Sequence, residues 1–173
     1  WKGIIHPENP TFILDFAPRD LSPLPEPSSS AVFISKKKKK NNPKCRPPKP
    51  PVLSQNAPPP SPLMSQGIIC NGMVYCSGSL GLDPKTGQFV PGDASDRTVQ
   101  ALRNLEQILL AGGSDLSKVV KVTIFLSSMD HYGKVNEGYA KVFTHDVKPC
   151  RTCVAVAKLP LDAEVEIELV ASV

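Results

Sequence analysis

Two glutamates near the end of the chain occupy alternate positions of a strand-like segment. Glu166 and Glu168 alternate with Val165, Ile167 and Leu169, and side chains two residues apart on a strand point to the same face. One face of this strand is therefore acidic and the other apolar. A carboxylate on such a face can position or deprotonate a water molecule. Taken alone, the pattern favours a simpler interpretation, which is a solvent-facing edge strand.

An arginine opens an apolar segment about fifteen residues earlier. Arg151 and Cys153 are two residues apart at the start of a strand-like run that ends at residue 157, so they share one face of that strand. A guanidinium offers a planar fork of donors that can bind a carboxylate through two parallel hydrogen bonds. The competing interpretation is an ordinary surface arginine at a strand end, which the arginine by itself favours.

Cys150 and Cys153 have the C-x-x-C spacing of redox and zinc sites. A second cysteine pair and a histidine at ligand spacing are missing. The motif also leads directly into a strand, whereas a thioredoxin-like motif opens a helix. We therefore predict no metal site and no redox role. The chain has five cysteines, an odd number, and its sequence has no apparent secretory signal, so we predict free thiols in a reducing compartment.

The elements that must position these residues alternate along the second part of the chain. Asn71-Gly72 between two apolar runs predicts a hairpin, and Gly112-Gly113 should end the first helix. Ser95 is the predicted N-cap of that helix, and Asp130 that of a second helix. The predicted strands are residues 67–70, 73–77, 119–126, 152–157 and 164–171, with a loop over residues 78–92.

This order, ββαβαββ, predicts an α+β domain with one mixed sheet and its helices on one face. A domain of about 110 residues buries only about two-thirds of its surface. Its sheet edges need covering, and oligomerisation is one way to cover them.

Composition separates this domain from a Pro/Lys-rich tail. Fifteen of the 19 prolines lie in residues 1–62. Ten Lys/Arg and four Asp/Glu give those residues a net charge of +6, while ten and twelve give the remainder −2. We predict a disordered tail over residues 1–50 and a domain over residues 51–173. The run of five lysines from Lys36 resembles a nuclear-localisation or polyanion-binding patch, although a solvated linker explains it better.

The domain resembles the RidA family of enamine/imine deaminases. The motifs appear in family order and at nearly family spacing over the whole domain. They are Ser65-Gln66-Gly67, Val74-Tyr75-Cys76-Ser77-Gly78, Asp83-Pro84-Lys85-Thr86-Gly87, Val135-Asn136-Glu137, Pro149-Cys150-Arg151-Thr152-Cys153-Val154 and Val165-Glu166-Ile167-Glu168.

The resemblance implies a chorismate-mutase-like fold and a homotrimer with active sites in the clefts between subunits. It implies hydrolysis of 2-imino acids, such as 2-iminobutanoate and 2-iminopropanoate, to 2-keto acids and ammonia, with no metal or organic cofactor. Arg151 matches the arginine that binds the substrate carboxylate, and Glu166 the carboxylate that positions water. Gly78, Asn136 and Cys153 match substrate-binding positions, with Cys153 acting through its backbone.

One position departs from the family pattern. Met64 stands where the family commonly has tyrosine, so a thioether replaces a phenol hydroxyl that could bind substrate or water. We expect deaminase activity with an altered rate or specificity.

Several alternatives remain open. A non-catalytic trimeric small-ligand-binding or chaperone-like protein could use the same fold, because function depends on the site rather than on the fold. The acidic domain makes nucleic-acid binding a poor expectation, and the short apolar runs exclude a membrane-spanning helix. The predicted compartment is the cytoplasm or the mitochondrion.

Overall fold

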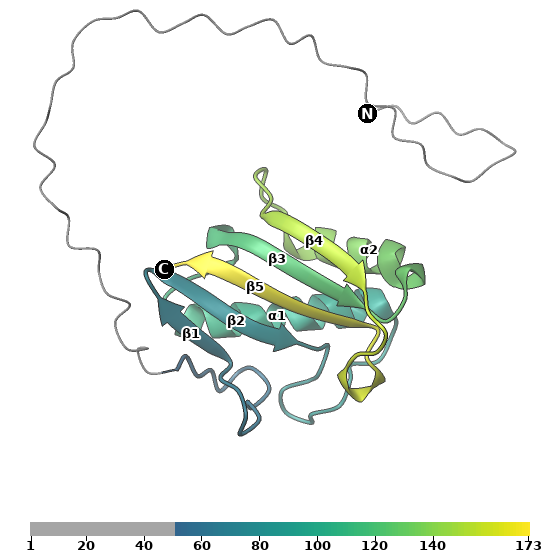
Figure 1. Ribbon diagram of the computed structural model, residues 1–173, viewed down its shortest axis with the longest axis horizontal. Helices are drawn as coiled ribbons and strands as arrows, with labels where there is room; N and C mark the ends of the chain where they lie inside the picture. The colour runs from purple at the N-terminus through teal and green to yellow at the C-terminus, as the bar shows by residue number, and fades with distance from the viewer. Residues whose placement is uncertain (1–50) are drawn as a thin grey trace, which may run out of the picture. The chain divides into compact units, whose positions relative to one another are not determined.

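Figure 1 presents the computed structural model, which describes residues 51–173. The predicted tail, residues 1–50, lies outside the described residues, so its disorder and the domain boundary at residue 51 stay predictions. The described residues have the predicted ββαβαββ order. The elements are β1 (Gly67–Cys70), β2 (Met73–Ser79), α1 (Ala94–Ala111), β3 (Val119–Leu126), α2 (Tyr132–Val142), β4 (Cys150–Ala155) and β5 (Val165–Ser172).

The five strands form one sheet in the order β1-β2-β5-β3-β4. All neighbouring pairs are antiparallel except β3 and β4, which run parallel and are connected through α2. Both helices lie on the same face of this sheet, behind it in Figure 1, as predicted. The β4 strand is an edge strand, with a neighbour on one side only within the described residues.

Turn residues fix the hairpin and the end of the first helix. Asn71 and Gly72 have φ angles of 51° and 76°, as the tight turn between antiparallel strands requires. Gly112 caps α1, and Gly113 follows with a φ of 79°, in the left-handed region that glycine adopts at low cost. Both predictions from the glycine and asparagine positions are confirmed.

The two predicted N-caps are wrong. The Asp93 carboxylate accepts hydrogen bonds from the backbone N–H groups of Ser95 and Asp96, at 2.8 and 3.4 Å, so α1 begins one residue before Ser95. The Ser128 hydroxyl accepts from the backbone N–H of Asp130 at 3.1 Å. It thereby caps a 3₁₀ turn (Met129–His131) that continues into α2.

The ends of three strands also differ from the sequence prediction, because pairing with the neighbouring strands decides where a strand begins and ends. One of them, β5, begins and ends one residue later than predicted. The β2 strand continues past a bulge to Ser79, which pairs with Ile167, so the predicted loop begins two residues later. The β4 strand starts where Lys121 pairs with Cys150 and ends where Leu126 pairs with Ala155. The six residues of β4 therefore pair with residues 121–126 of β3.

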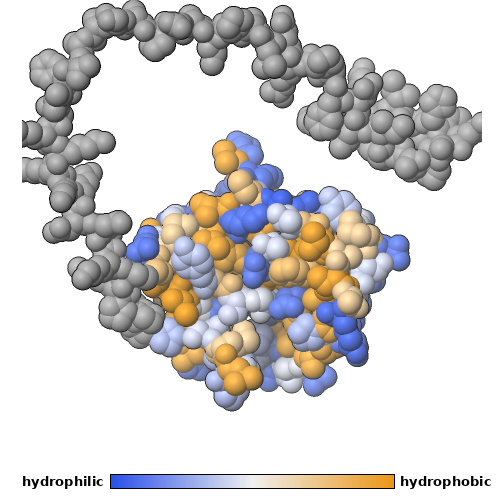
Figure 2. Space-filling model, in the orientation of Figure 1, coloured by the Kyte–Doolittle hydropathy of each residue, from blue (hydrophilic) through white to orange (hydrophobic). Residues whose placement is uncertain are grey.

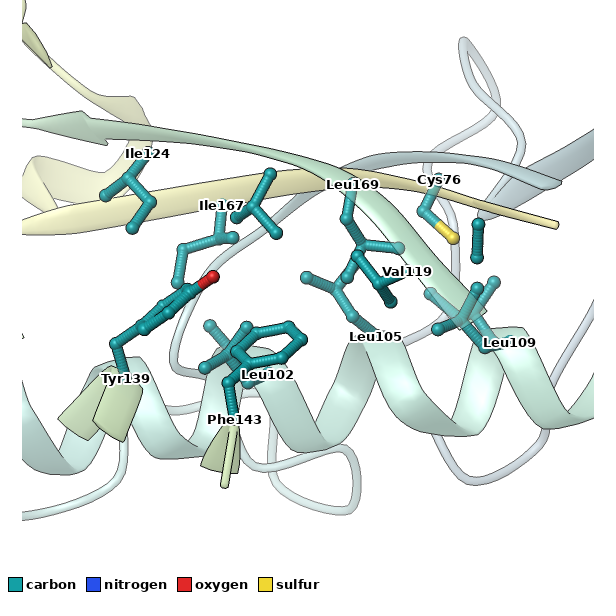
Figure 3. Packing of buried hydrophobic residues seen from close by; sticks show 14 of the residues in the cluster. Cys76, Leu102, Leu105, Leu109, Val119, Ile124, Tyr139, Phe143, Ile167 and Leu169 are labelled. Atoms are coloured by element: carbon teal, nitrogen blue, oxygen red, sulfur yellow. The ribbon is translucent and has the colours of Figure 1, made fainter. Parts of the chain in front are cut away.

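The core lies between the sheet and the helices (Figure 3). It is made of fully or almost fully buried side chains from α1, the α2 region and the inner face of the sheet. These include Leu102, Leu105, Leu109, Val135, Tyr139, Phe143, Val122, Ile124, Ile167 and Leu169. Gly138 brings the two helices close, because a Cβ there would lie 2.4 Å from the main-chain oxygen of Ser95.

No element within residues 51–173 covers the opposite face of the sheet. Ile68, Tyr75 and Val154 on this open face are 39%, 48% and 41% exposed. Figure 2 shows apolar patches on this face with polar residues between them. A surface of this kind suits contact with another protein surface.

Candidate active site

Strand register places Arg151 and Cys153 on the helix side of the sheet. Arg151 pairs with Val122 and Cys153 with Ile124, and both partners are fully buried beneath the helices. Paired residues on neighbouring strands point to the same face. Arg151 and Cys153 therefore lie at the β4 edge, next to α2.

Helix α2 supports the Arg151 guanidinium. Its Nη1 donates a 2.9 Å hydrogen bond to Asn136 Oδ1, and its Nη2 lies 3.5 Å from the Tyr132 hydroxyl. The Tyr139 ring lies beneath the guanidinium, with the ring centroid 4.8 Å from the arginine Cζ. The structure thus brings together the predicted residues Arg151 and Asn136.

The Arg151 guanidinium remains able to bind an anion. Among the described residues it has no carboxylate partner, and a guanidinium has five N–H donors, of which these contacts use two. The side chain is exposed. A planar, fixed and unpaired cation of this kind suits the carboxylate of a small acid.

The two cysteines of the C-x-x-C motif point to opposite faces of β4. They are three residues apart on a strand, so Cys153 faces the helices and Cys150 the open face. Burial raises the pKa of the Cys153 thiol, and the nearby Arg151 charge only partly opposes this shift. A protonated thiol is a poor nucleophile. Residues 51–173 contain no cluster of three or more His, Cys, Asp or Glu side chains arranged to hold a metal ion.

Glu166 lies on the open face, beside Gly78. Register pairs Glu166 with Phe125, one position away from the buried Ile167. A Cβ added at Gly78 would lie 2.0 Å from Glu166 Oε1, so the Glu166 carboxylate rests against the β2 backbone where only glycine leaves room. The structure thus brings together a second predicted pair.

Burial raises the pKa of the Glu166 carboxyl, and the neighbouring Glu168 charge raises it further. A raised pKa makes a carboxylate a stronger base, since a general base works best when its pKa lies near the operating pH. Glu166 therefore has the electrostatic setting of a group that accepts a proton from water.

Two cavities lie beside the β2 residues next to Gly78, and Glu166 lines neither of them. The smaller, of about 290 Å³, is lined by Gly78, Met64 and several polar residues, and by apolar residues that include Ile108 of α1; the polar residues are Ser61, Gln66, Ser77 and Ser79. The larger, of about 700 Å³, is lined by Met64, Ser77, Tyr75 and Glu168 among others. Met64 and Ser77 line both cavities.

The predicted site residues therefore form two groups in one chain. Arg151, Asn136 and Cys153 lie on the helix side of the β4 edge, whereas Gly78 and Glu166 lie on the open face. Within a single chain the sheet separates these groups. Neither cavity is lined by residues of the first group.

Sequence analysis did not identify Tyr132 and Tyr139 as contacts of Arg151. The available signal was their spacing, since Tyr132, Asn136 and Tyr139 are four and three residues apart and such residues share one face of a helix. The spacing could not show which strand this helix face contacts.

Comparisons with known proteins agree on one family. Residues 54–173 match the family described as endoribonuclease L-PSP. The chain is 44% identical over 107 residues to the 2-iminobutanoate/2-iminopropanoate deaminase of Mus musculus, covering 62% of this chain and 78% of that protein. It is 43% identical over 110 residues to the mitochondrial protein mmf1 of Schizosaccharomyces pombe, covering 62% and 66%. The crystal structure of E. coli TdcF with bound serine has a TM-score of 0.68 and 32% identity, covering 72% of this chain and 98% of that one.

Proposed function

The chain belongs to the RidA (YjgF) family, whose endoribonuclease L-PSP domain spans residues 54–173, and we propose that it hydrolyses 2-imino acids to 2-keto acids and ammonia. Arg151 binds the substrate carboxylate, and Glu166 positions the water and accepts its proton. Gly78, Asn136 and the Cys153 backbone complete the substrate contacts. No metal or organic cofactor takes part.

The chemistry needs one cation and one base. The water oxygen bonds to the imine carbon of the protonated imine, and the water proton passes to the Glu166 carboxylate. That proton is then delivered to the amino nitrogen, and the C–N bond breaks as the C=O bond forms. The remaining hydroxyl proton passes to the departing ammonia, which leaves as ammonium, so Glu166 ends in its starting state. The raised pKa of Glu166 suits it to accept and return the water proton.

A single observation carries the proposal: Arg151 has unused donors and no carboxylate partner within the described domain. A relative with the same fold, E. coli TdcF, has been crystallised with bound serine. Serine, like the proposed 2-imino acid substrates, is a small molecule with a carboxylate. An anion of this kind matches the planar fork of Arg151.

The site requires two chains. Because Arg151 and Glu166 lie on opposite faces of one sheet, one substrate can reach both only where the β4 edge of one subunit meets the open face of another. We propose a homotrimer with three such sites. The partly apolar open face and the edge strand β4 are the surfaces that this assembly would cover.

Turnover tests the proposal directly. Threonine dehydratase generates 2-iminobutanoate, and semicarbazide traps the fraction that escapes hydrolysis. We expect the chain to lower the trapped fraction, and Arg151→Ala and Glu166→Gln to abolish this effect. Arg103→Ala, at an exposed position of α1, is the matched control and should stay active. An equal trapped fraction of 2-iminobutanoate with and without the folded wild-type protein would refute the proposed deaminase activity.

Mixing tests the shared site. Chains with Arg151→Ala and chains with Glu166→Gln should each be inactive. When they are unfolded and refolded together, about a quarter of the interfaces receive both intact residues, so about a quarter of wild-type activity should return. No recovery from mixed oligomers would place both residues in the same chain's site and contradict the arrangement.

Two alternative functions have less support from the sequence and the structure. A non-catalytic ligand-binding or chaperone-like protein would bind 2-keto acids without turnover, and Met64 is the residue that favours it. RNA cleavage has little electrostatic support, because residues 63–173 hold ten Lys/Arg and twelve Asp/Glu. The compartment stays the cytoplasm or the mitochondrion. Neither helix of the described domain is long and apolar enough to cross a membrane.

A further inference from the structure

The Tyr132 hydroxyl carries a proton that no residue of the described domain accepts. Tyr132 is the first residue of α2, and its hydroxyl oxygen lies 3.5 Å from Arg151 Nη2. A guanidinium has no acceptor, so in this contact the phenol oxygen accepts and its own O–H remains unused. The contact is the only hydrogen bond of this hydroxyl within residues 51–173, and Tyr132 is 38% exposed. The proton is therefore available to a ligand.

The length of this contact leaves room for a shared acceptor. Its 3.5 Å exceeds the roughly 2.9 Å of a typical N–H···O hydrogen bond, so the two groups bind each other weakly. An anionic oxygen at about 2.8 Å from both donors would form two hydrogen bonds of ordinary length. Arg151 Nη2 and the Tyr132 hydroxyl thus suit one shared oxygen better than they suit each other.

Helix α2 fixes the position of Tyr132 relative to the guanidinium. Asn136, four residues later and on the same helix face, accepts a 2.9 Å hydrogen bond from Arg151 Nη1. The Tyr139 ring lies under the same guanidinium, with its centroid 4.8 Å from Cζ. Three residues of one helix therefore contact Arg151, and the Tyr132 hydroxyl stands beside the Nη2 end of its fork.

A bound carboxylate needs more donors than Arg151 alone provides. Its two oxygens have about four lone-pair sites, and a bidentate guanidinium fills two of them. In the proposed site between two chains, the second subunit excludes water, and an oxygen lone pair without a donor there would weaken binding. The Tyr132 hydroxyl is placed to supply a third hydrogen bond.

We propose that the Tyr132 hydroxyl binds the substrate carboxylate together with Arg151. This inference rests on the proposed deaminase function for its substrate and adds a binding residue to it. The carboxylate keeps its charge throughout hydrolysis of the imine, so a hydrogen bond to it is equally strong in the ground state and in the transition state. Tyr132 therefore acts on KM, whereas Glu166 acts on kcat.

Binding of the product measures this hydrogen bond without turnover. Calorimetric titration with 2-oxobutanoate gives the dissociation constants of the wild-type protein and of Tyr132→Phe, which keeps the ring and removes only the hydroxyl. A hydrogen bond to a charged group is worth about tenfold or more, so Tyr132→Phe should bind 2-oxobutanoate about tenfold more weakly. Hydrogen bonds to charged groups are about twice as strong as those between neutral groups, so the loss for uncharged 2-oxobutanamide should be about threefold at most.

Steady-state kinetics with 2-iminobutanoate provides a second measurement. We expect Tyr132→Phe to raise KM about tenfold and to leave kcat within about twofold of the wild type. Tyr75→Phe is the matched control, because Tyr75 is the other exposed tyrosine of the described domain, at 48%, and makes none of the Arg151 contacts. It should keep the wild-type affinity and KM.

The possible results are distinguishable. An unchanged affinity of Tyr132→Phe for 2-oxobutanoate, or an equal loss for the acid and its amide, would overturn this inference and leave the deaminase function standing. A fall in kcat at unchanged KM would also overturn it, because Tyr132 would then act on the reacting atoms. The expected loss of 2-oxobutanoate affinity, in a protein whose wild type does not hydrolyse 2-iminobutanoate, would overturn the deaminase function and support the carboxylate site.

Discussion

Replacing Gly78 by alanine should remove most of the activity and leave the fold intact. The new Cβ would lie 2.0 Å from Glu166 Oε1, whereas an ordinary contact needs about 3.4 Å. The carboxylate oxygen must therefore retreat by about 1.4 Å, and a misplacement of about 1 Å can cost roughly a hundredfold in rate. We expect kcat/KM to fall by about a hundredfold.

The same change should cost little stability. Gly78 does not have a positive φ, so alanine fits its backbone and gains about 0.5–1 kcal/mol from reduced freedom of the unfolded chain. Moving the Glu166 side chain to another rotamer costs about 0.5–1.5 kcal/mol. The two nearly cancel, and urea unfolding should give a free energy within about 1 kcal/mol of the wild type.

A double mutant shows whether the loss acts through Glu166. In the Glu166→Gln background, where the base is already absent, Gly78→Ala should reduce the residual imine turnover by less than about threefold. Gly133→Ala is the control, because a Cβ there meets nothing within 4 Å. A wild-type rate for Gly78→Ala, or a full hundredfold loss in both backgrounds, would refute the reasoning.

Three further changes give separate tests. Gly138→Ala places a Cβ 2.4 Å from the Ser95 main-chain oxygen, so α1 and α2 must separate. The free energy of unfolding in urea should fall by about 1–3 kcal/mol, and an unchanged value would contradict this packing. Tyr139→Phe removes a buried hydroxyl that has no hydrogen-bond partner and keeps the ring, so the free energy of unfolding should stay equal or rise by about 1 kcal/mol. A loss of that size would show that the hydroxyl does have a hydrogen-bond partner. Glu168→Gln removes the second of the two causes, after burial, that raise the pKa of Glu166. Deprotonation of Glu166 then becomes easier, so the acidic limb of kcat/KM should move to lower pH; a limb that stays or moves upward would contradict the assignment of Glu166 as the base.

The same pKa shift sets the sign of a stability effect. A raised pKa means that the folded chain binds the Glu166 proton more tightly than the unfolded chain does. The contribution of this group to stability is therefore largest at low pH and falls as the pH rises from the ordinary glutamate range to the raised value.

Local chemistry made most of the fold predictable from sequence. The hairpin at Asn71-Gly72 and the helix end at Gly112-Gly113 depend on backbone angles that few other residues adopt, so the residue types sufficed. The two N-caps were harder to predict because several residues that can cap a helix stand close together in the sequence. Only the hydrogen bonds in the structure show which of them is the cap. Asp93 rather than Ser95 caps α1 because its carboxylate reaches two N–H groups.

The positions of the site residues needed the three-dimensional structure. Alternation along each strand predicted which residues share a face, and this is correct for Glu166 with Glu168 and for Arg151 with Cys153. It could not relate the faces of different strands, because that depends on the register of β3 with both β4 and β5. Only this register puts Arg151 and Glu166 on opposite faces.

This separation has a chemical consequence in the proposed assembly. If Arg151 and Glu166 shared a face in one chain, they could form an ion pair that would occupy both groups and lower the pKa of the carboxyl. On opposite faces, the guanidinium keeps donors for a substrate carboxylate and Glu166 keeps its raised pKa. When two chains meet, the substrate and its water can stand between the two groups, and exclusion of solvent there strengthens both interactions. In the proposed assembly, the sheet thus keeps the carboxylate-binding Arg151 and the water-binding Glu166 apart within one chain, and the subunit interface brings them to the same substrate.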